Sequence, residues 1–174
     1  GGFTQVLLER GARRVIALDV GHGQLAAPVR EDPRVAVVEG VNARSLTAHE
    51  LAETSEIDER PELVVADVSF ISLTTILPAL LDTVGPEADY VLLIKPQFEV
   101  GRQGIREGLV RDRARRHDAA SAVLWAAWDL GLGTAGLISS PLLGSNGNQE
   151  YLVWLSRAVG GNPTEWTGTV AALL

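Results

Sequence analysis

Residues 63–94 read LVVADVSFISLTTILPALLDTVGPEADYVLLI, and this stretch decides the fold. It begins with the run 63–68 and ends with the run 90–94, each nearly apolar on both faces, which is typical of buried parallel strands. Between them, residues 73–84 carry a helical pattern that is entered from Ser72 and ends at Gly85 and Pro86. A strand, a helix and a second strand in this order predict a βαβ unit.

The same pattern extends in both directions along the chain. Residues 15–20 (VIALDV) and 35–39 (VAVVE) predict two earlier strands, and residues 3–10 and 113–130 predict helices. Residues 136–140 and 151–155 predict two final strands with no helix between them, so that pair should be antiparallel. The sequence therefore predicts an α/β fold of the Rossmann-like type, with a mostly parallel sheet and an antiparallel last strand.

Composition narrows the function classes. The 174 residues contain no cysteine, which excludes disulfides, thiolate zinc sites and cysteine nucleophiles, and the histidines show no metal-like spacing, so no metal is expected. No apolar run approaches the roughly 20 residues that cross a bilayer. We expect one soluble, cytoplasmic domain without a membrane partner. The net charge of −7 argues against general nucleic-acid binding but permits a local basic face.

The first candidate site combines glycines with an acidic residue. Gly1, Gly2, Phe3 and Thr4 open the first predicted helix, and Asp19 ends the strand that follows. Glycine at a helix start lets a ligand approach the backbone, and an acid at the end of the next strand can bind ribose hydroxyls. Alternatively, the glycines only form a tight turn and Asp19 only caps a loop.

Two further candidates end strands of the predicted sheet. Asp67 lies where the run 63–68 gives way to a helix, at the sheet edge where open α/β folds bind ligands. Lys95, the only lysine in the chain, ends the most apolar strand. Unlike arginine, lysine can lose its proton when it is desolvated, so Lys95 is a candidate base. The simpler alternatives are that Asp67 caps a helix and that Lys95 extends from a strand end into water.

Glu150 and a group of arginines complete the candidates. Glu150 begins the last strand after the glycine- and asparagine-rich loop 144–148, where a glutamate can also be an ordinary strand-end residue. The arginines follow Lys95 in the chain and could bind RNA phosphates, or could form a solvated helix face. They are Arg102, Arg106, Arg111 and Arg113, with Arg115 and Arg116 next to them.

Several strings of the chain, taken in order, closely resemble the TlyA family of rRNA 2'-O-methyltransferases within the FtsJ-like group. The strings are GGFT, LDVGHGQL, NAR, VVADVSFISL, LIKPQFEVGR, VRD, SPLLG and GNQEYLVWL. The resemblance covers nearly the whole chain. It implies a Rossmann-like class I methyltransferase that moves a methyl group from S-adenosyl-L-methionine to a ribose 2'-hydroxyl of ribosomal RNA, on cytidine in the family.

The resemblance also implies roles for individual residues. Asp67, Lys95 and Glu150 match the last three members of the group's Lys-Asp-Lys-Glu catalytic tetrad. Residues that match the cofactor site are expected at the methionine part, the ribose and the adenine of S-adenosylmethionine. These are Gly1, Gly2, Phe3 and Thr4, then Asp19 and Val20, then Asn42, and Asp67 is expected to bind the cofactor as well. Ribosomal RNA or a ribosomal subunit is the expected partner.

The chain departs from the family pattern at its start. The first tetrad lysine, the first strand of the sheet, the opening of the cofactor loop and an S4-type RNA-binding domain would all precede Gly1. We therefore expect residues 1–160 to be an N-terminally truncated methyltransferase domain that lacks the first strand, followed by a tail at 161–174. A Rossmann-type NAD-dependent oxidoreductase and a non-catalytic fragment remain as alternatives.

Overall fold

The computed structural model describes residues 1–101 and 108–173. The six predicted strands are all present, with ends that differ by up to three residues from the predicted ones. The strands are β1 (Val15–Asp19), β2 (Val35–Glu39), β3 (Leu63–Ala66), β4 (Asp89–Ile94), β5 (Gly133–Ser139) and β6 (Tyr151–Ser156). The longer helices are α1 (Gly2–Glu9), α3 (Ala48–Ser55), α4 (Leu73–Val84), α6 (Arg113–Asp129) and α7 (Thr167–Leu173). The short ones are α2 (Ala27–Arg30), η1 (Ala43–Ser45), α5 (Pro96–Glu99), η3 (Ser145–Gly147) and η4 (Pro163–Trp166).

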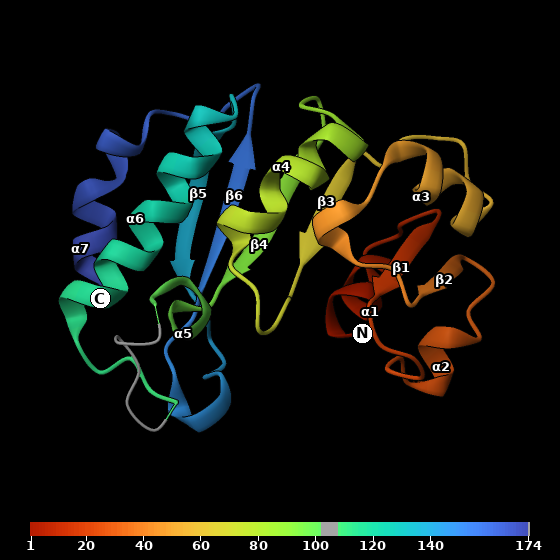
Figure 1. Cartoon of the computed structure of the whole chain (residues 1–174), viewed down its shortest axis with the longest axis horizontal. Coiled ribbons are helices and arrows are strands. Elements are labelled where there is room, and N and C mark those ends of the chain that lie inside the picture. The colour runs from red at the N-terminus through yellow and green to blue at the C-terminus, as the bar shows by residue number, and fades with distance from the viewer. Residues whose placement is uncertain (102–107, 174) are drawn as a thin grey trace.

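The strands form two sheets. In the larger sheet the order is β3-β4-β6-β5, and β3 runs parallel to β4 while β6 is antiparallel to both of its neighbours. This confirms the predicted antiparallel last strand. In the smaller sheet, β1 and β2 are parallel, with Val15 opposite Val35 and Asp19 opposite Glu39. Figure 1 shows the smaller sheet with α1, α2 and α3 at one end of the molecule, and α6 and α7 at the other.

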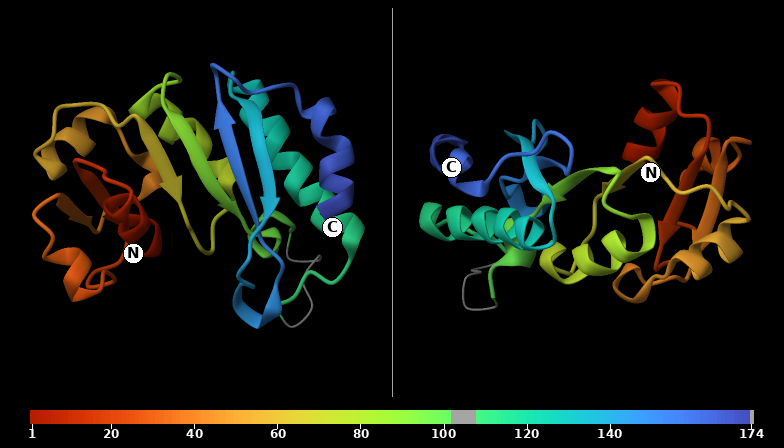
Figure 2. Two further views of the ribbon diagram at one scale, coloured as in Figure 1. Left: turned by 180° about the vertical axis from the view of Figure 1, so that it is seen from behind. Right: turned by 90° about the horizontal axis from the view of Figure 1, so that it is seen from above.

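In the described part of the chain, no strand of the smaller sheet pairs with a strand of the larger one. Within residues 1–101 and 108–173, β1 pairs only with β2, and β3 pairs only with β4, so each has one edge without a neighbouring strand. Figure 2 shows both edges from behind and from above. The sequence predicts one mostly parallel sheet, whereas the structure has a break in it between β1, which ends at Asp19, and β3, which is followed by Asp67.

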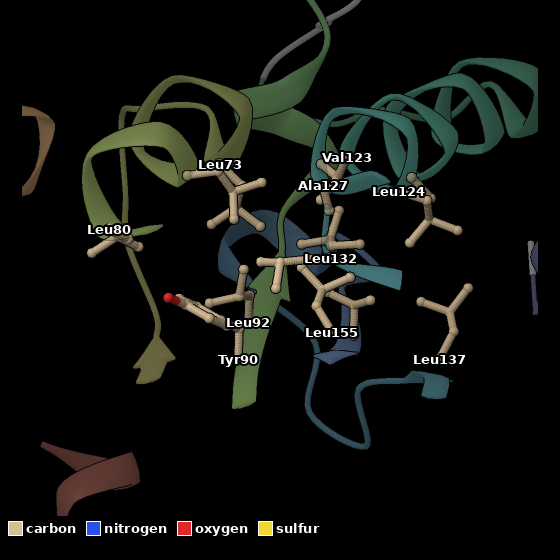
Figure 3. Close-up of a cluster of buried hydrophobic side chains, with 14 of the residues drawn as sticks. Leu73, Leu80, Tyr90, Leu92, Val123, Leu124, Ala127, Leu132, Leu137 and Leu155 are labelled. Atoms are coloured by element: carbon tan, nitrogen blue, oxygen red, sulfur yellow. The ribbon is translucent and has the colours of Figure 1, made fainter. Parts of the chain in front are cut away.

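The hydrophobic core lies on one face of the larger sheet. Tyr90, Leu92 and Ile94 alternate along β4 and are fully buried, because side chains two residues apart share a face of a strand. They pack against α4 and α6, for example against Leu77 and Val123, and Figure 3 shows this cluster. The opposite face carries Val91 and Leu93, which are only partly buried, so it can contribute to a binding site.

The C-terminal segment packs onto this core. Residues 161–173, expected to be a tail, form η4 and α7. Asn162 and Glu165 cap η4 reciprocally, which satisfies two backbone N–H groups at the helix start. Val170 of α7 is 2% exposed and belongs to the core cluster. This segment is therefore part of the folded unit.

Candidate active site

A pocket of about 860 Å³ lies at the carboxyl ends of β3 and β4. Leu93 and Leu152, which are paired across β4 and β6, form its floor on the sheet face opposite the core. Helix α1 contributes Gly2 and Phe3 to its wall. The loops after β3 and β4 and the segment 140–150 complete the wall, and we call this cavity the strand-end pocket.

The strand-end pocket holds Lys95 and Asp67 as an ion pair. The Lys95 Nζ atom lies 2.7 Å from Asp67 Oδ1, and the side chain of Lys95 is 13% exposed while that of Asp67 is 55% exposed. Lys95 Nζ also donates a hydrogen bond of 3.2 Å to Ser69 Oγ. The ammonium lies 5.9 Å from the ring centroid of Phe98, within cation–π range. Because β3 and β4 are parallel neighbours, their carboxyl ends bring these groups together.

Glu150 enters the same pocket from the start of β6. Its side chain is 5% exposed, and its Oε1 accepts a hydrogen bond of 2.8 Å from Gln97 Nε2. Gly144 lies against the carboxylate: a Cβ added there would stand 2.0 Å from Glu150 Oε1. Asn148, buried in the same segment, donates to Gly108 O and accepts from the backbone N–H of Val110. The segment 144–150 is thus held in place by hydrogen bonds and close packing.

A partly buried carboxylate, that of Glu99, joins the loops that carry Asp67 and Lys95. Glu99 of α5 accepts a hydrogen bond from Ser72 Oγ and another, of 2.8 Å, from the backbone N–H of Leu73 at the start of α4. Burial raises the pKa of Glu99 above its ordinary value, and the hydrogen bonds from Ser72 and Leu73 oppose that rise. Glu99 therefore connects α5 to the N-terminus of α4.

The raised pKa of Glu99 predicts a pH-dependent stability. The folded protein binds the Glu99 proton more tightly than the unfolded chain, so this contribution is complete below the ordinary pKa of 4.5 and is lost as pH rises through the folded-state pKa. We expect the unfolding free energy of the wild type, relative to Glu99→Gln, to fall as pH rises above 4.5. Urea denaturation at several pH values measures this difference. If the wild type instead gains stability relative to Glu99→Gln as pH rises, the raised pKa of Glu99 is contradicted.

The residues expected at the cofactor are divided between two places. Gly2 and Phe3 line the strand-end pocket together with Asp67, whereas Gly1, Thr4, Asp19, Val20 and Asn42 are not among its lining residues. Thr4 is buried on the other side of α1, and Val20 is 67% exposed. Asp19 Oδ1 accepts a hydrogen bond of 2.8 Å from the backbone N–H of Gly21. Asn42 Oδ1 accepts one from Arg44 N and so caps η1.

The candidate RNA-binding arginines lie at the start of α6 or before it. Arg102 and Arg106 fall outside the described residues. Arg111 and Arg113 are exposed. Burial raises the pKa of Tyr151, and the positive charges of Arg116 and Arg113 oppose that rise. The N-terminal end of α6 therefore carries exposed arginines.

The structure brings further residues to the pocket or next to it that the sequence did not indicate. Gln97 contacts Glu150, Gly144 makes room for it, and Glu99 caps α4. Phe70 is 92% exposed and has a φ of 64°, an uncommon conformation for a residue other than glycine. Its ring centroid lies 5.2 Å from that of Phe98. These residues lie in the strings VSF and KPQFE and in the loop 144–148, which carry no local pattern that indicates these contacts.

Within residues 1–101 and 108–173, no three acidic or histidine side chains gather as a metal site would require. No helix in this part of the chain has the length and apolar character needed to span a membrane.

A family model for FtsJ-like methyltransferases matches residues 1–157. The chain belongs to this family. It is 51% identical over 156 residues to the 16S/23S rRNA (cytidine-2'-O)-methyltransferase TlyA of Mycobacterium tuberculosis. It is 39% identical over 153 residues to hemolysin A of Brachyspira hyodysenteriae. The first match covers 89% of this chain but 56% of the relative, so the chain spans little more than half of that protein's length.

Solved structures agree with this assignment. A putative hemolysin from Lactococcus lactis superposes with a TM-score of 0.87 at 38% identity, over 97% of this chain and 82% of that one. A putative hemolysin from Streptococcus thermophilus superposes with a TM-score of 0.88 at 39% identity, over 99% of this chain and 62% of that one. The FtsJ-like domain therefore has the mixed α/β methyltransferase fold that the sequence predicted, and the family match gives no support to an NAD-dependent oxidoreductase.

Proposed function

We propose that this FtsJ-like domain transfers a methyl group from S-adenosyl-L-methionine to a ribose 2'-hydroxyl of ribosomal RNA, on cytidine as the names of its relatives state. The observation that carries the proposal is the pair of Lys95 and Asp67 in a pocket that also holds Glu150 and the start of α1. A lysine and two carboxylates beside a glycine-opened helix fit the site of such a transfer.

The residues present fit the cofactor. Gly2 lines the strand-end pocket, and no atom lies within 4 Å of the place where its side chain would begin, so a ligand can approach the α1 backbone there. Asp19, held by Gly21 at the end of β1, is placed to bind the ribose hydroxyls, and Asn42 follows β2. When bound, the cofactor supplies an electrophilic methyl group on a sulfonium.

The protein's task is to align and deprotonate a poor nucleophile. Lys95 orients the ribose hydroxyl and, in its neutral form, accepts the hydroxyl proton on Nζ. Asp67, which contacts Nζ directly, fixes the position of the amine and compensates the positive charge that the proton brings. Glu150 adds a second carboxylate to the same pocket. Arg111 and Arg113 would contact RNA phosphates, and Arg102 and Arg106 are proposed to do the same.

A methylation assay tests the proposed function. Ribosomal subunits are incubated with the protein and with S-adenosylmethionine labelled in the methyl group, and the RNA is then digested to nucleosides. We expect label in a 2'-O-methylated cytidine, and calorimetry should detect binding of S-adenosylhomocysteine and not of NADH. Label found only on a base, or binding of NADH, would contradict the proposal.

Replacement of Asp19 by alanine tests the proposed cofactor site separately. Loss of a charged hydrogen-bond acceptor should weaken S-adenosylhomocysteine binding roughly tenfold to a hundredfold. Turnover at saturating cofactor should change less, because Asp19 does not line the strand-end pocket. Isothermal titration gives the affinity and single-turnover rates give the chemistry. Unchanged affinity would place the ribose elsewhere.

A further inference from the structure

Gln97 is buried in the strand-end pocket and donates a hydrogen bond to one of the proposed catalytic groups, Glu150. The side chain is 7% exposed, lines the strand-end pocket, and donates from Nε2 to Glu150 Oε1. The two residues are 53 positions apart, and they join α5 to the start of β6.

Gly144 packs closely against the same Glu150 carboxylate. A Cβ at Gly144 would lie 2.0 Å from Glu150 Oε1 and 2.4 Å from its Cδ. The carboxylate is therefore packed closely against Gly144 and hydrogen-bonded to the Gln97 amide. A neutral amide can donate to an ionised carboxylate without adding a charge of its own.

Packing alone does not account for glutamine at position 97. Gln97 Oε1 is buried and has no hydrogen-bond partner among residues 1–101 and 108–173, although buried polar atoms are normally paired. An apolar side chain would avoid this unpaired acceptor. A buried acceptor without a hydrogen-bond partner destabilises the fold, and proteins keep such groups mainly at functional sites.

We infer that Gln97 is a positioning residue that acts through Glu150, holding its carboxylate at a fixed place in the strand-end pocket. This inference rests on the proposed methyl transfer. Helix α5 supports it, because Lys95 is its N-cap residue and Gln97 follows two positions later. Lys95, Pro96 and Gln97 are consecutive, so a short piece of chain connects the Lys95 amine to the amide that hydrogen-bonds Glu150. The other charged residues that line the pocket are Lys95 and Asp67, and Arg113 and Arg116 lie near Tyr151.

The test compares Gln97→Glu, Gln97→Met and the wild type. A carboxylate at position 97 would face Glu150 at hydrogen-bond distance, and two carboxylates so placed share one proton. The acid limb of the kcat/KM profile for methyl transfer should then move to higher pH by about one unit or more. In Gln97→Met the profile should keep its shape while kcat falls roughly tenfold to a hundredfold with the KM for the cofactor unchanged.

A matched control exists on α1. Gln5 Nε2 donates to Glu9 Oε1 at 2.9 Å in the same arrangement, but both side chains are exposed. Gln5→Glu should leave the pH profile where it is, because water screens the added charge. A shift of equal size in Gln5→Glu, or no shift in Gln97→Glu, would overturn the inference and leave Gln97 as a packing residue.

A second readout does not need methyl transfer at all. The shared proton in Gln97→Glu is bound more tightly by the folded protein than by the unfolded chain, so the stability of this variant relative to the wild type should fall as pH rises from 5 to 8, about the range in which such pairs titrate. Urea denaturation measures this. If wild-type protein methylates no RNA, the proposed function fails, while a pH-dependent stability difference still supports the coupling of Gln97 to Glu150 and its absence refutes it.

Discussion

The Lys95→Arg variant is expected to lose methyl transfer by at least roughly a hundredfold, the usual contribution of a positioned proton acceptor. Arginine keeps the positive charge beside Asp67 but does not give up its proton at any accessible pH. Its planar head is also larger than the ammonium, which is 2.7 Å from Asp67 Oδ1 and 3.2 Å from Ser69 Oγ. Affinity for S-adenosylhomocysteine should change little, because none of these contacts is at the proposed ribose site.

Single-turnover methylation of ribosomal subunits with labelled cofactor measures this loss, and calorimetry with S-adenosylhomocysteine reports whether the site is intact. Arg14→Lys is the matched control, since it exchanges the same two basic side chains at an exposed ion pair, 3.5 Å from Glu59. That pair should contribute little to stability or activity. Turnover by Lys95→Arg equal to that of the wild type would mean that the only lysine of the chain is structural.

The site residues at the ends of β3 and β4 could be predicted because the sequence pattern that marks a strand end is local. Asp67 and Lys95 each follow an apolar run, and parallel neighbouring strands bring such residues to one edge of a sheet. Glu150 could be placed for the same reason, since a strand that runs antiparallel to β4 begins beside the carboxyl end of β4. Ile94 of β4 is indeed opposite Tyr151 of β6.

The C-terminal helix could not be predicted in this way. Residues 167–173 read TGTVAAL, with threonine and glycine in the first turn, which are weak helix formers. Helix α7 exists because Val170 is buried in the core next to α6 and β5. That burial is a tertiary contact, and short helices depend on such packing more than on their own propensity.

Residues that support the site were missed for a related reason. The hydrogen bonds of Gln97 and Glu99 reach partners 53 and 26 residues away, so neither has a periodic or spaced pattern in the sequence. Conversely, the sequence places Asp19, like Asp67 and Lys95, at a strand end of one predicted sheet. It ends β1 in the smaller sheet and does not line the strand-end pocket, because β1 and β3 are not paired.

The second large effect is expected from the Gly144→Ala variant. Gly144 has a φ of −73°, which any residue can adopt, so its replacement adds no backbone strain. The added Cβ would instead stand 2.0 Å from Glu150 Oε1, and the carboxylate would have to move. A displaced Glu150 should lower the rate of methyl transfer roughly a hundredfold, as small misplacements of catalytic groups do. The melting temperature should change little, because the far end of a side chain moves more easily than backbone.

A double-mutant cycle separates this mechanism from general damage to the loop. If Gly144→Ala acts by moving Glu150, it should cost nothing further in a Glu150→Ala background, since the group it displaces is already gone. Gly168→Ala in α7 is the matched control, because no atom lies within 4 Å of its added Cβ and the position is exposed. It should leave single-turnover rates unchanged. Additive losses in the double variant would mean that Gly144 serves the site by a route other than Glu150, such as direct contact between its backbone and the bound nucleotide.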